Sequence, residues 1–131
     1  MPLIKSNQFA ASVAAALYDY EKDVLEAVGK AVVETGKRSL RVVQSKSPVR
    51  SGEYKKSWKI KEITTGIYGS QVSVIIHNKK YYRLTHLLEY GHQKKGGGRV
   101  EGAAHIRPAY EEADRILPVL TAQAIEGAAQ K

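Results

Sequence analysis

The sequence predicts an α+β fold in a single domain spanning residues 1–131: a long N-terminal helix, a small antiparallel sheet of two to four strands, a short helix, and a C-terminal helix packed on the sheet. Near both ends of the chain, apolar residues recur at intervals of three and four, which indicates helices. In the middle they recur at every second position, which indicates strands. A chain of 131 residues is long enough for one domain that buries roughly two thirds of its unfolded surface.

The first predicted helix runs from Asn7 to Gln44, and its length has a consequence for assembly. At about 1.5 Å per residue it extends beyond roughly 50 Å, whereas a compact chain of this size is roughly 35 Å across. The helix therefore either breaks near Gly29 or Gly36, or it projects and a neighbouring subunit covers its apolar stripe. We favour the neighbour. The predicted oligomer interface is the stripe formed by Val13, Leu17, Val24 and Val28.

Pro48 ends the first helix, because the residue before a proline is pushed out of the helical region. Gly52 then supplies a turn. Period-two alternation begins at Trp58, and a second strand is expected from Gln71 to His77, with Val72, Val74 and Ile76 on one face. The pattern predicts an antiparallel meander that is apolar on one side.

Two helices and a loop are expected in the last third of the chain. The first is a short helix from Arg83 to Tyr90, with Gly91 as its C-terminal stop. Residues 93–102 contain three consecutive glycines and are predicted to form a flexible basic loop. The final helix is expected to begin at Pro108, to place acidic residues in or just beyond its first turn, and to kink or divide at Pro118. Its predicted buried stripe consists of Ala113, Ile116, Leu117, Leu120 and Ala124.

The net charge of +8 is concentrated in the middle of the chain, because residues 47–102 carry eleven basic and four acidic side chains. Such a positive region attracts polyanions or an acidic protein face. Lys94, Lys95 and Arg99 could follow a nucleic acid through its phosphates without reading its sequence. An ordinary solvated surface is the alternative interpretation of the same charges.

Catalytic chemistry finds little support in the sequence. Cysteine is absent, so a thiolate nucleophile or a disulfide is impossible, and no nucleophile elbow or phosphate-binding loop occurs. A metal-dependent hydrolase using His86, Glu89 and His92 is a remaining alternative, although these residues lack the usual zinc-ligand spacing. We therefore predict no enzymatic activity, no metal and no cofactor. The longest apolar run is also too short to span a membrane.

Three short blocks occur in a characteristic order along the chain. They are Ser47-Pro48-Val49-Arg50-Ser51-Gly52 leading to Trp58, then Leu87-Leu88-Glu89-Tyr90-Gly91, and finally His105-Ile106-Arg107-Pro108-Ala109. Over about 65 residues, their order and spacing resemble the tail-component family of long-tailed bacteriophages. The chain departs from the family at the turn, where it has Arg50-Ser51-Gly52 in place of the Asp-Thr-Gly of many members.

This resemblance implies a structural virion protein that joins the head to the tail or completes the tail. Such subunits assemble into a ring at the neck, commonly a hexamer, and DNA passes through the lumen. The resemblance implies neck and tail proteins as partners, a virion location after synthesis in the host cytoplasm, and a lumen-facing role for the basic loop. The residues it assigns to structure and assembly are Pro48, Gly52, Trp58, Leu88, Glu89, Gly91, Arg107 and Pro108. The alternative function is a small basic module that binds nucleic acid non-specifically.

Overall fold

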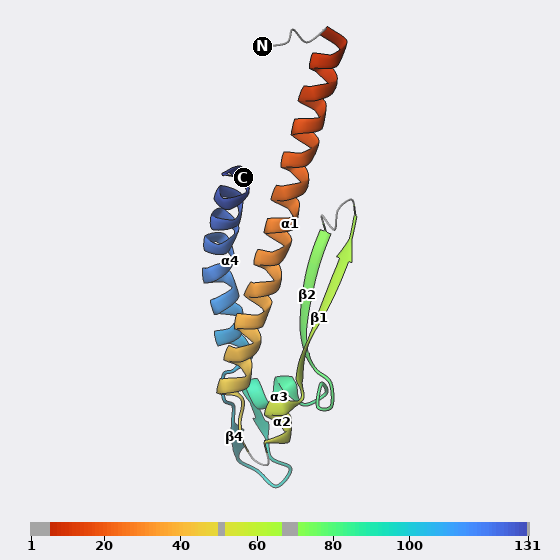
Figure 1. Cartoon of the computed structure of the whole chain (residues 1–131). Helices are drawn as coiled ribbons and strands as arrows, with labels where there is room; N and C mark the ends of the chain where they lie inside the picture. Colours follow the sequence, from red (N-terminus) through yellow and green to blue (C-terminus); the bar gives the residue numbers. More distant parts are fainter. Residues whose placement is uncertain (1–5, 50–51, 67–70, 131) are drawn as a thin grey trace.

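A computed structural model describes residues 6–49, 52–66 and 71–130. It contains two long helices, two short helices and two hairpins (Figure 1). In chain order the elements are α1 (Ser6–Lys46), α2 (Glu53–Lys56), β1 (Trp58–Thr65), β2 (Gln71–Asn78), α3 (Thr85–Tyr90), β3 (Gly91–Gln93), β4 (Arg99–Glu101) and α4 (Ile106–Ala129). The predicted α+β class is confirmed.

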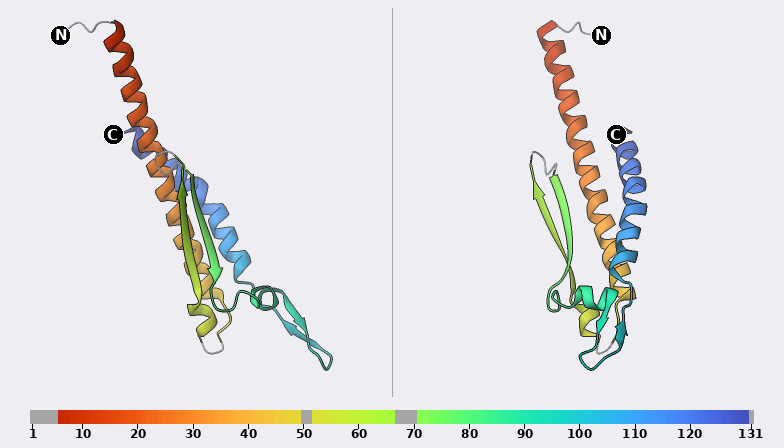
Figure 2. Two further views of the ribbon diagram at one scale, coloured as in Figure 1. Left: turned by 90° about the vertical axis from the view of Figure 1, so that its right-hand side faces the viewer. Right: turned by 180° about the vertical axis from the view of Figure 1, so that it is seen from behind.

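Helix α1 is the axis of the molecule. Helix α4 packs along one side of it, and the β1–β2 hairpin packs on another side (Figures 1 and 2). The expectation that the C-terminal helix packs on the sheet is therefore wrong in this detail, because α1 lies between the two. The physical reason is that α1 packs on two sides. One side contacts α4, and the other, where its two glycines lie, contacts the β1–β2 hairpin. The elements α2, α3, β3 and β4 gather at the end of α1 where that helix stops (Figure 2).

Helix α1 is continuous over 41 residues, roughly 60 Å, so it does not break at either internal glycine. Both glycines instead face the sheet. A Cβ atom added at Gly36 would lie 2.5 Å from Val74 Cγ1, and one added at Gly29 would lie 3.0 Å from Val72 Cγ2. The two glycines thus let strand β2 approach the helix closely.

Strands β1 and β2 pair antiparallel along their whole length, from Trp58 opposite Asn78 to Thr65 opposite Gln71. Val72, Val74 and Ile76 share the half-buried face of β2, as the alternation predicted. Trp58, at the start of β1, belongs to the core cluster that it forms with Val43 of α1 and Ala109 of α4. The core therefore lies near the C-terminal end of α1, where the starts of β1 and α4 meet that helix.

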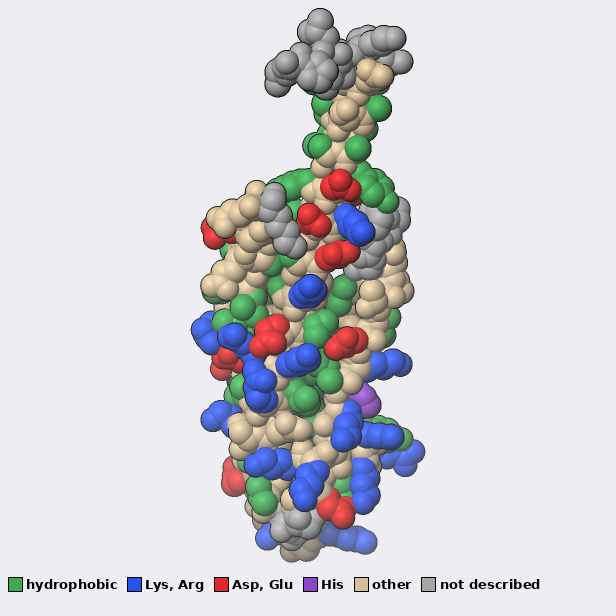
Figure 3. All heavy atoms as spheres, in the orientation of Figure 1, with side chains coloured by type: hydrophobic (Ala, Val, Ile, Leu, Met, Phe, Trp, Pro, Cys, Tyr) green, Lys and Arg blue, Asp and Glu red, His purple; other side chains and the backbone are tan. Residues whose placement is uncertain are grey.

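The N-terminal part of α1 extends beyond the other described elements (Figures 1 and 3). We call residues 8–22 the N-terminal rod, and every one of these side chains is exposed. Apolar members include Phe9, exposed by 60%, Val13 by 42% and Leu17 by 63%. Val24 and Val28, farther along the predicted stripe, are half-buried. The projection that the sequence predicted is thus observed.

The later segments differ from expectation in several ways. The predicted loop over residues 93–102 contains a second hairpin, in which Gln93 pairs with Arg99. Helix α4 begins at Ile106 rather than at Pro108, and its first turn contains no acidic residue. It also passes through Pro118 without dividing. Of its predicted stripe Ile116 is buried, while Leu117 is exposed. Among the described residues, no helix has both the length and the apolar character of a membrane span.

Candidate functional site: a motif junction beside an apolar cleft

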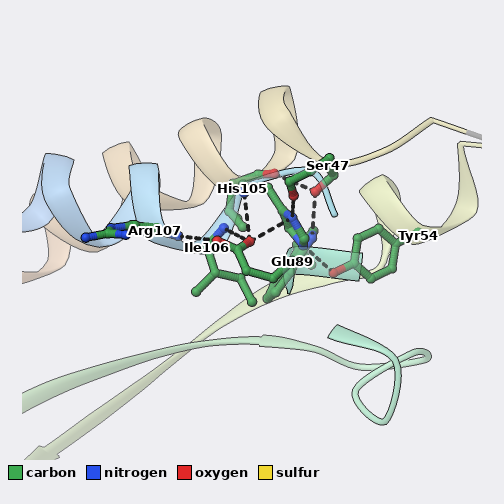
Figure 4. A network of polar contacts seen from close by, with 9 residues as sticks. Ser47, Tyr54, Glu89, His105, Ile106 and Arg107 are labelled. Atoms are coloured by element: carbon green, nitrogen blue, oxygen red, sulfur yellow. Dashed lines mark hydrogen bonds and ion pairs between the residues drawn. The ribbon is translucent and has the colours of Figure 1, made fainter. Parts of the chain in front are cut away.

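The three sequence blocks, far apart in the chain, meet at the lower end of α1 around Glu89 (Figure 4). We call this cluster the motif junction, and its members are Ser47, Tyr54, Trp58, Glu89 and His105. Glu89 lies in α3 and is only 6% exposed. Its Oε1 accepts the backbone N–H groups of His105 at 2.8 Å and Ile106 at 2.7 Å, and its Oε2 accepts that of Arg107 at 3.1 Å. A carboxylate from a different segment thus caps helix α4.

This capping arrangement suits a negative charge. The first N–H groups of a helix have no partner within the helix, and the helix dipole is positive at that end. Burial by itself raises the pKa of Glu89, but the hydrogen bonds from the backbone N–H groups of His105, Ile106 and Arg107, together with the nearby His105 ring, hold that pKa below its usual value. The carboxylate is therefore ionised in the folded protein at neutral pH.

The His105 ring is fully buried and connects the capping carboxylate to the first sequence block. Its Nδ1 lies 2.7 Å from the Ala103 carbonyl and 2.9 Å from Glu89 Oε1. Because both of these oxygens can only accept, Nδ1 carries a proton and donates it. Its Nε2 forms a hydrogen bond with the Tyr54 hydroxyl, at 2.6 Å, and is the acceptor when the ring is neutral. The histidine thus closes the turn before α4 by hydrogen bonding.

The first block is held to the core by a second chain of hydrogen bonds. Trp58 Nε1 donates to Ser47 Oγ at 2.9 Å, and that hydroxyl donates in turn to the Val43 carbonyl in the last turns of α1. Ring packing adds to these bonds, since Trp58 and Tyr54 each meet His105 edge-on, with centroids 5.9 and 5.4 Å apart. The junction therefore ties the end of α1 to α3 and to the start of α4.

An acid, a histidine and a hydroxyl in line superficially resemble a nucleophilic triad, but the geometry serves structure. Both Glu89 oxygens are occupied by backbone groups, and His105 is 0% exposed, so no substrate atom reaches them. Burial, with a smaller effect of the Glu89 charge, raises the pKa of Tyr54 to about 12. An activated nucleophile needs the opposite shift. The network holds segments together.

An open cleft lies beside the junction, with a volume of about 730 Å³. We call it the apolar cleft, because most of its lining is aliphatic or aromatic. One residue of the lining, His92, has a buried Nδ1 with no hydrogen-bond partner among the described residues. The lining comprises Pro48, Val49, Tyr54, Tyr81, Leu84, Leu87, Leu88, His92, Val100, Glu101 and Ala103.

The predicted motif residues occupy distinct places around these two features. Pro48 and Leu88 line the cleft. Gly52 precedes α2 with a φ of 83°, and Gly91 ends α3 with a φ of 82°. A Cβ at Gly91 would lie 2.4 Å from the Val100 carbonyl oxygen, so the β3–β4 hairpin itself requires glycine there. Trp58 lies within the junction.

The two motif residues of the last block act mainly through the backbone. Arg107 contributes its N–H to the Glu89 cap, while its guanidinium points to solvent and pairs with Glu111 at 3.4 Å. Pro108 lies in the first turn of α4 and is half-buried. Its missing N–H is not needed, because the cap ends one residue earlier, at Arg107.

The basic residues predicted to face a lumen lie on the second hairpin. Lys94 and Lys95 are exposed in its turn. Arg99 lies in β4, where its guanidinium donates to the Tyr90 carbonyl and lies 3.9 Å from Glu101. The three predicted residues are therefore close in sequence but differ in role, because Arg99 braces its own hairpin.

The structure gives no support to the metal alternative of His86, Glu89 and His92. Glu89 already spends both oxygens on the helix cap, and His86 is exposed on the short helix. Across residues 6–49, 52–66 and 71–130, no group of three potential ligands lies close enough to hold a metal ion.

Several residues of the site were not selected from the sequence. Ser47, Tyr54 and His105 stood within the sequence blocks but had no assigned role. Asn78, buried at the end of β2, donates to the Tyr54 carbonyl and accepts the Tyr81 N–H. At Gly102 a Cβ would lie 2.4 Å from the Glu89 carbonyl oxygen.

Comparison with known families decides the class of protein. A family model described as "Bacteriophage HK97-gp10, putative tail-component" matches residues 11–91. The chain belongs to this family of phage tail components. The match runs from α1 through α3 and ends at Gly91, so it includes the first two sequence blocks, while the His105–Ala109 block lies beyond it. No curated protein and no solved structure matches the chain.

Family membership supports a structural component of the phage tail and interaction with other tail proteins. The matched region holds most of the N-terminal rod, from Ala11 onward, together with the hairpin that packs on α1. The motif junction therefore belongs to a scaffold that orients a projecting helix, a basic hairpin and an apolar cleft.

Proposed function

We propose that this tail component forms a homo-oligomeric ring, a hexamer by resemblance, at the phage neck, where it joins or completes the tail at the head and lets DNA pass through its lumen. The observation that carries this proposal is the N-terminal rod. It bears an apolar stripe, including Leu17 at 63% exposure, that the described part of its own chain leaves uncovered. Apolar surface of this kind, continuous along a helix, indicates a protein–protein contact.

The rod also determines where the contact lies. Val13 and Leu17 belong to the exposed part of the stripe, whereas Val24 and Val28 are already half-buried by the body of the chain. We assign Val13 and Leu17 to the subunit interface proper. Val24 and Val28 mark the place where the interface passes into the fold. A closed assembly of one polypeptide meets this need through symmetry, because each copy covers a neighbour.

Lys94 and Lys95, in the turn between β3 and β4, are assigned to the lumen. They are exposed at the tip of a projecting hairpin (Figure 2). Repeated around a ring, they would form a positive collar that contacts DNA phosphates without sequence preference. Arg99 would support this collar indirectly, because its guanidinium ties the hairpin to the Tyr90 carbonyl at the end of α3.

The proposal is tested by measuring particle mass over a range of protein concentrations, with electron microscopy of any large species. A discrete multimer with a central opening is expected, and a single-chain mass at every concentration would overturn the ring. For the collar, Lys94→Glu with Lys95→Glu should impair DNA retention in phage particles while leaving ring mass unchanged. Arg99→Glu is kept as a separate variant, because it also removes a structural bond. Normal DNA retention in the double variant would refute an electrostatic role.

A second function is favoured by one observation, the crowding of basic side chains over the lower part of the molecule (Figure 3). A small basic module that binds nucleic acid on its own would use these charges directly. The two functions respond differently to salt. Affinity for DNA falls steeply as salt rises, whereas association through apolar helix faces persists. Tight DNA binding by single chains, lost at high salt, would favour this alternative.

A further inference from the structure

The N-terminal rod and the apolar cleft lie at opposite ends of the molecule and are suited to each other. The rod presents Phe9, Val13, Leu17 and Tyr20, at spacings of four, four and three residues. This spacing places them on one stripe of the helix, and all four are exposed. The cleft at the far end presents the complementary surface, lined by Leu84, Leu87 and Leu88 of the α3 region among others.

We propose that the rod of one subunit inserts into the apolar cleft of the next, so that copies of this chain associate head to tail. This inference deepens the proposed ring and rests on it, since it names the two surfaces that meet. The mode is that of an amphipathic helix in an apolar groove, in which anchors at helical spacing fill the groove.

The rod cannot fill the cleft of its own chain. Helix α1 is continuous from Ser6 to Lys46, and the cleft begins just past its C-terminal end, at Pro48. About 30 residues of helix separate Leu17 from that end, which corresponds to roughly 45 Å. A rigid helix holds the two surfaces apart, so a rod that fills this cleft must belong to another copy of the chain.

Charge complementarity selects a second copy as the partner. Between Gln8 and Glu26 the helix carries four acidic residues and one lysine. Residues 79–101, which supply most of the cleft lining, carry six basic residues and two acids, and one of those acids is the buried Glu89. The acidic segment at the C-terminal end of the rod and the basic surroundings of the cleft thus attract each other.

One residue that lines the cleft, His92, also has an unpaired polar atom. Its Nδ1 is buried and has no hydrogen-bond partner among the described residues. Buried polar atoms are normally paired, so a side chain entering the cleft could offer this nitrogen a partner once the His92 ring adjusts. The Tyr20 hydroxyl is the polar group at the end of the apolar stripe, and a phenol can donate to or accept from an imidazole nitrogen.

The absence of native cysteine makes a clean cross-linking test possible in the full chain. One preparation carries Leu17→Cys and a second carries Leu84→Cys, both at exposed positions. After mixing and treatment with a short bis-maleimide, the two preparations should form a 17–84 cross-link, and neither alone should form much covalent dimer. Val49→Cys serves as a second cleft position. Ala11→Cys, on the opposite side of the rod, is the matched control and should cross-link to neither.

The outcomes separate the inference from the ring. Multimers that form without any cross-link between position 17 and positions 84 or 49 would overturn the inference and leave the ring standing. Strong 17–17 cross-linking of the Leu17→Cys chain alone would also overturn it, in favour of pairing between rods. Chains that remain single would refute the ring and the inference together. As an independent measure, Leu17→Glu should prevent assembly even at a protein concentration ten times that at which the wild type assembles. Ala11→Glu should leave assembly unchanged.

Discussion

The Glu89 carboxylate receives the backbone N–H of Ile106 at 2.7 Å, across seventeen residues of sequence that include an entire hairpin. This single relationship fixes the start of the last helix against the short helix α3. It also gives a physical reason for the acid that follows Leu87 and Leu88 in the second sequence block: Glu89 is buried and caps α4.

Removing the charge at the cap should destabilise the fold. We expect Glu89→Gln to lower the free energy of unfolding by about 1–3 kcal/mol, because an amide replaces a carboxylate that accepts three N–H groups. Urea unfolding at equal protein concentration measures the change. Glu111→Gln, at an exposed acid of the capped helix α4, is the control and should change stability by less than about 0.5 kcal/mol. Equal effects would contradict a capping role.

The cap should also make stability depend on pH. The pKa of Glu89 is lower in the folded chain than its ordinary value of 4.5. Its contribution is therefore present above the unfolded-state pKa and is lost as pH falls through the folded-state pKa. The difference in unfolding free energy between wild type and Glu89→Gln should shrink when pH falls from 7 to 3. A constant difference across that range would show that the ionised form is not what stabilises α4.

Tyr54→Phe tests the connection between the first and third sequence blocks. The change removes the hydroxyl that His105 Nε2 accepts and leaves a fully buried nitrogen unpaired. We expect a loss of about 1–3 kcal/mol in unfolding free energy. Tyr110→Phe, on an exposed tyrosine of α4, should be close to neutral. Indistinguishable melting curves for the two variants would show that the hydrogen bond between Tyr54 and His105 does not stabilise the fold.

Two helical glycines should respond in opposite directions to the same substitution. A methyl group at Gly36 meets Val74 Cγ1 at 2.5 Å, so Gly36→Ala must push β2 from the helix and should destabilise the chain. At Gly127 nothing lies within 4 Å, and Gly127→Ala should stabilise by up to about 1 kcal/mol. Thermal unfolding compares them directly. Stabilisation by both changes would mean that the sheet does not press on α1.

The rod should contribute to association and very little to the fold of one chain. We expect Leu17→Ser to change the unfolding free energy of the dissociated chain by less than about 0.5 kcal/mol. Val43→Ala, in the core and 1% exposed, should cost roughly 2 kcal/mol. The measurement is urea unfolding at a concentration where light scattering finds single chains. A large loss from Leu17→Ser would indicate that the rod folds back onto its own chain.

The parts of this molecule that follow local rules could be predicted. The period of the apolar residues located α1 and the β1–β2 hairpin, and Gly91 ended α3 as expected, because its positive φ is a local property of the backbone. The hairpin of β3 and β4 could not be found in this way. Its strands are three residues each, too short to establish a period, and its three glycines resemble a loop.

What the sequence by itself determined was the inventory: an α+β chain, a first helix longer than its own domain, three motif blocks in order, and a positive charge gathered in the middle. Only the tertiary structure decided the partners. It placed α1 between α4 and the sheet, and it revealed Glu89 as the cap of a helix in another segment. The physical reason is that periodicity and turn chemistry act between near neighbours in sequence, whereas a buried carboxylate finds its N–H partners only after distant segments have packed.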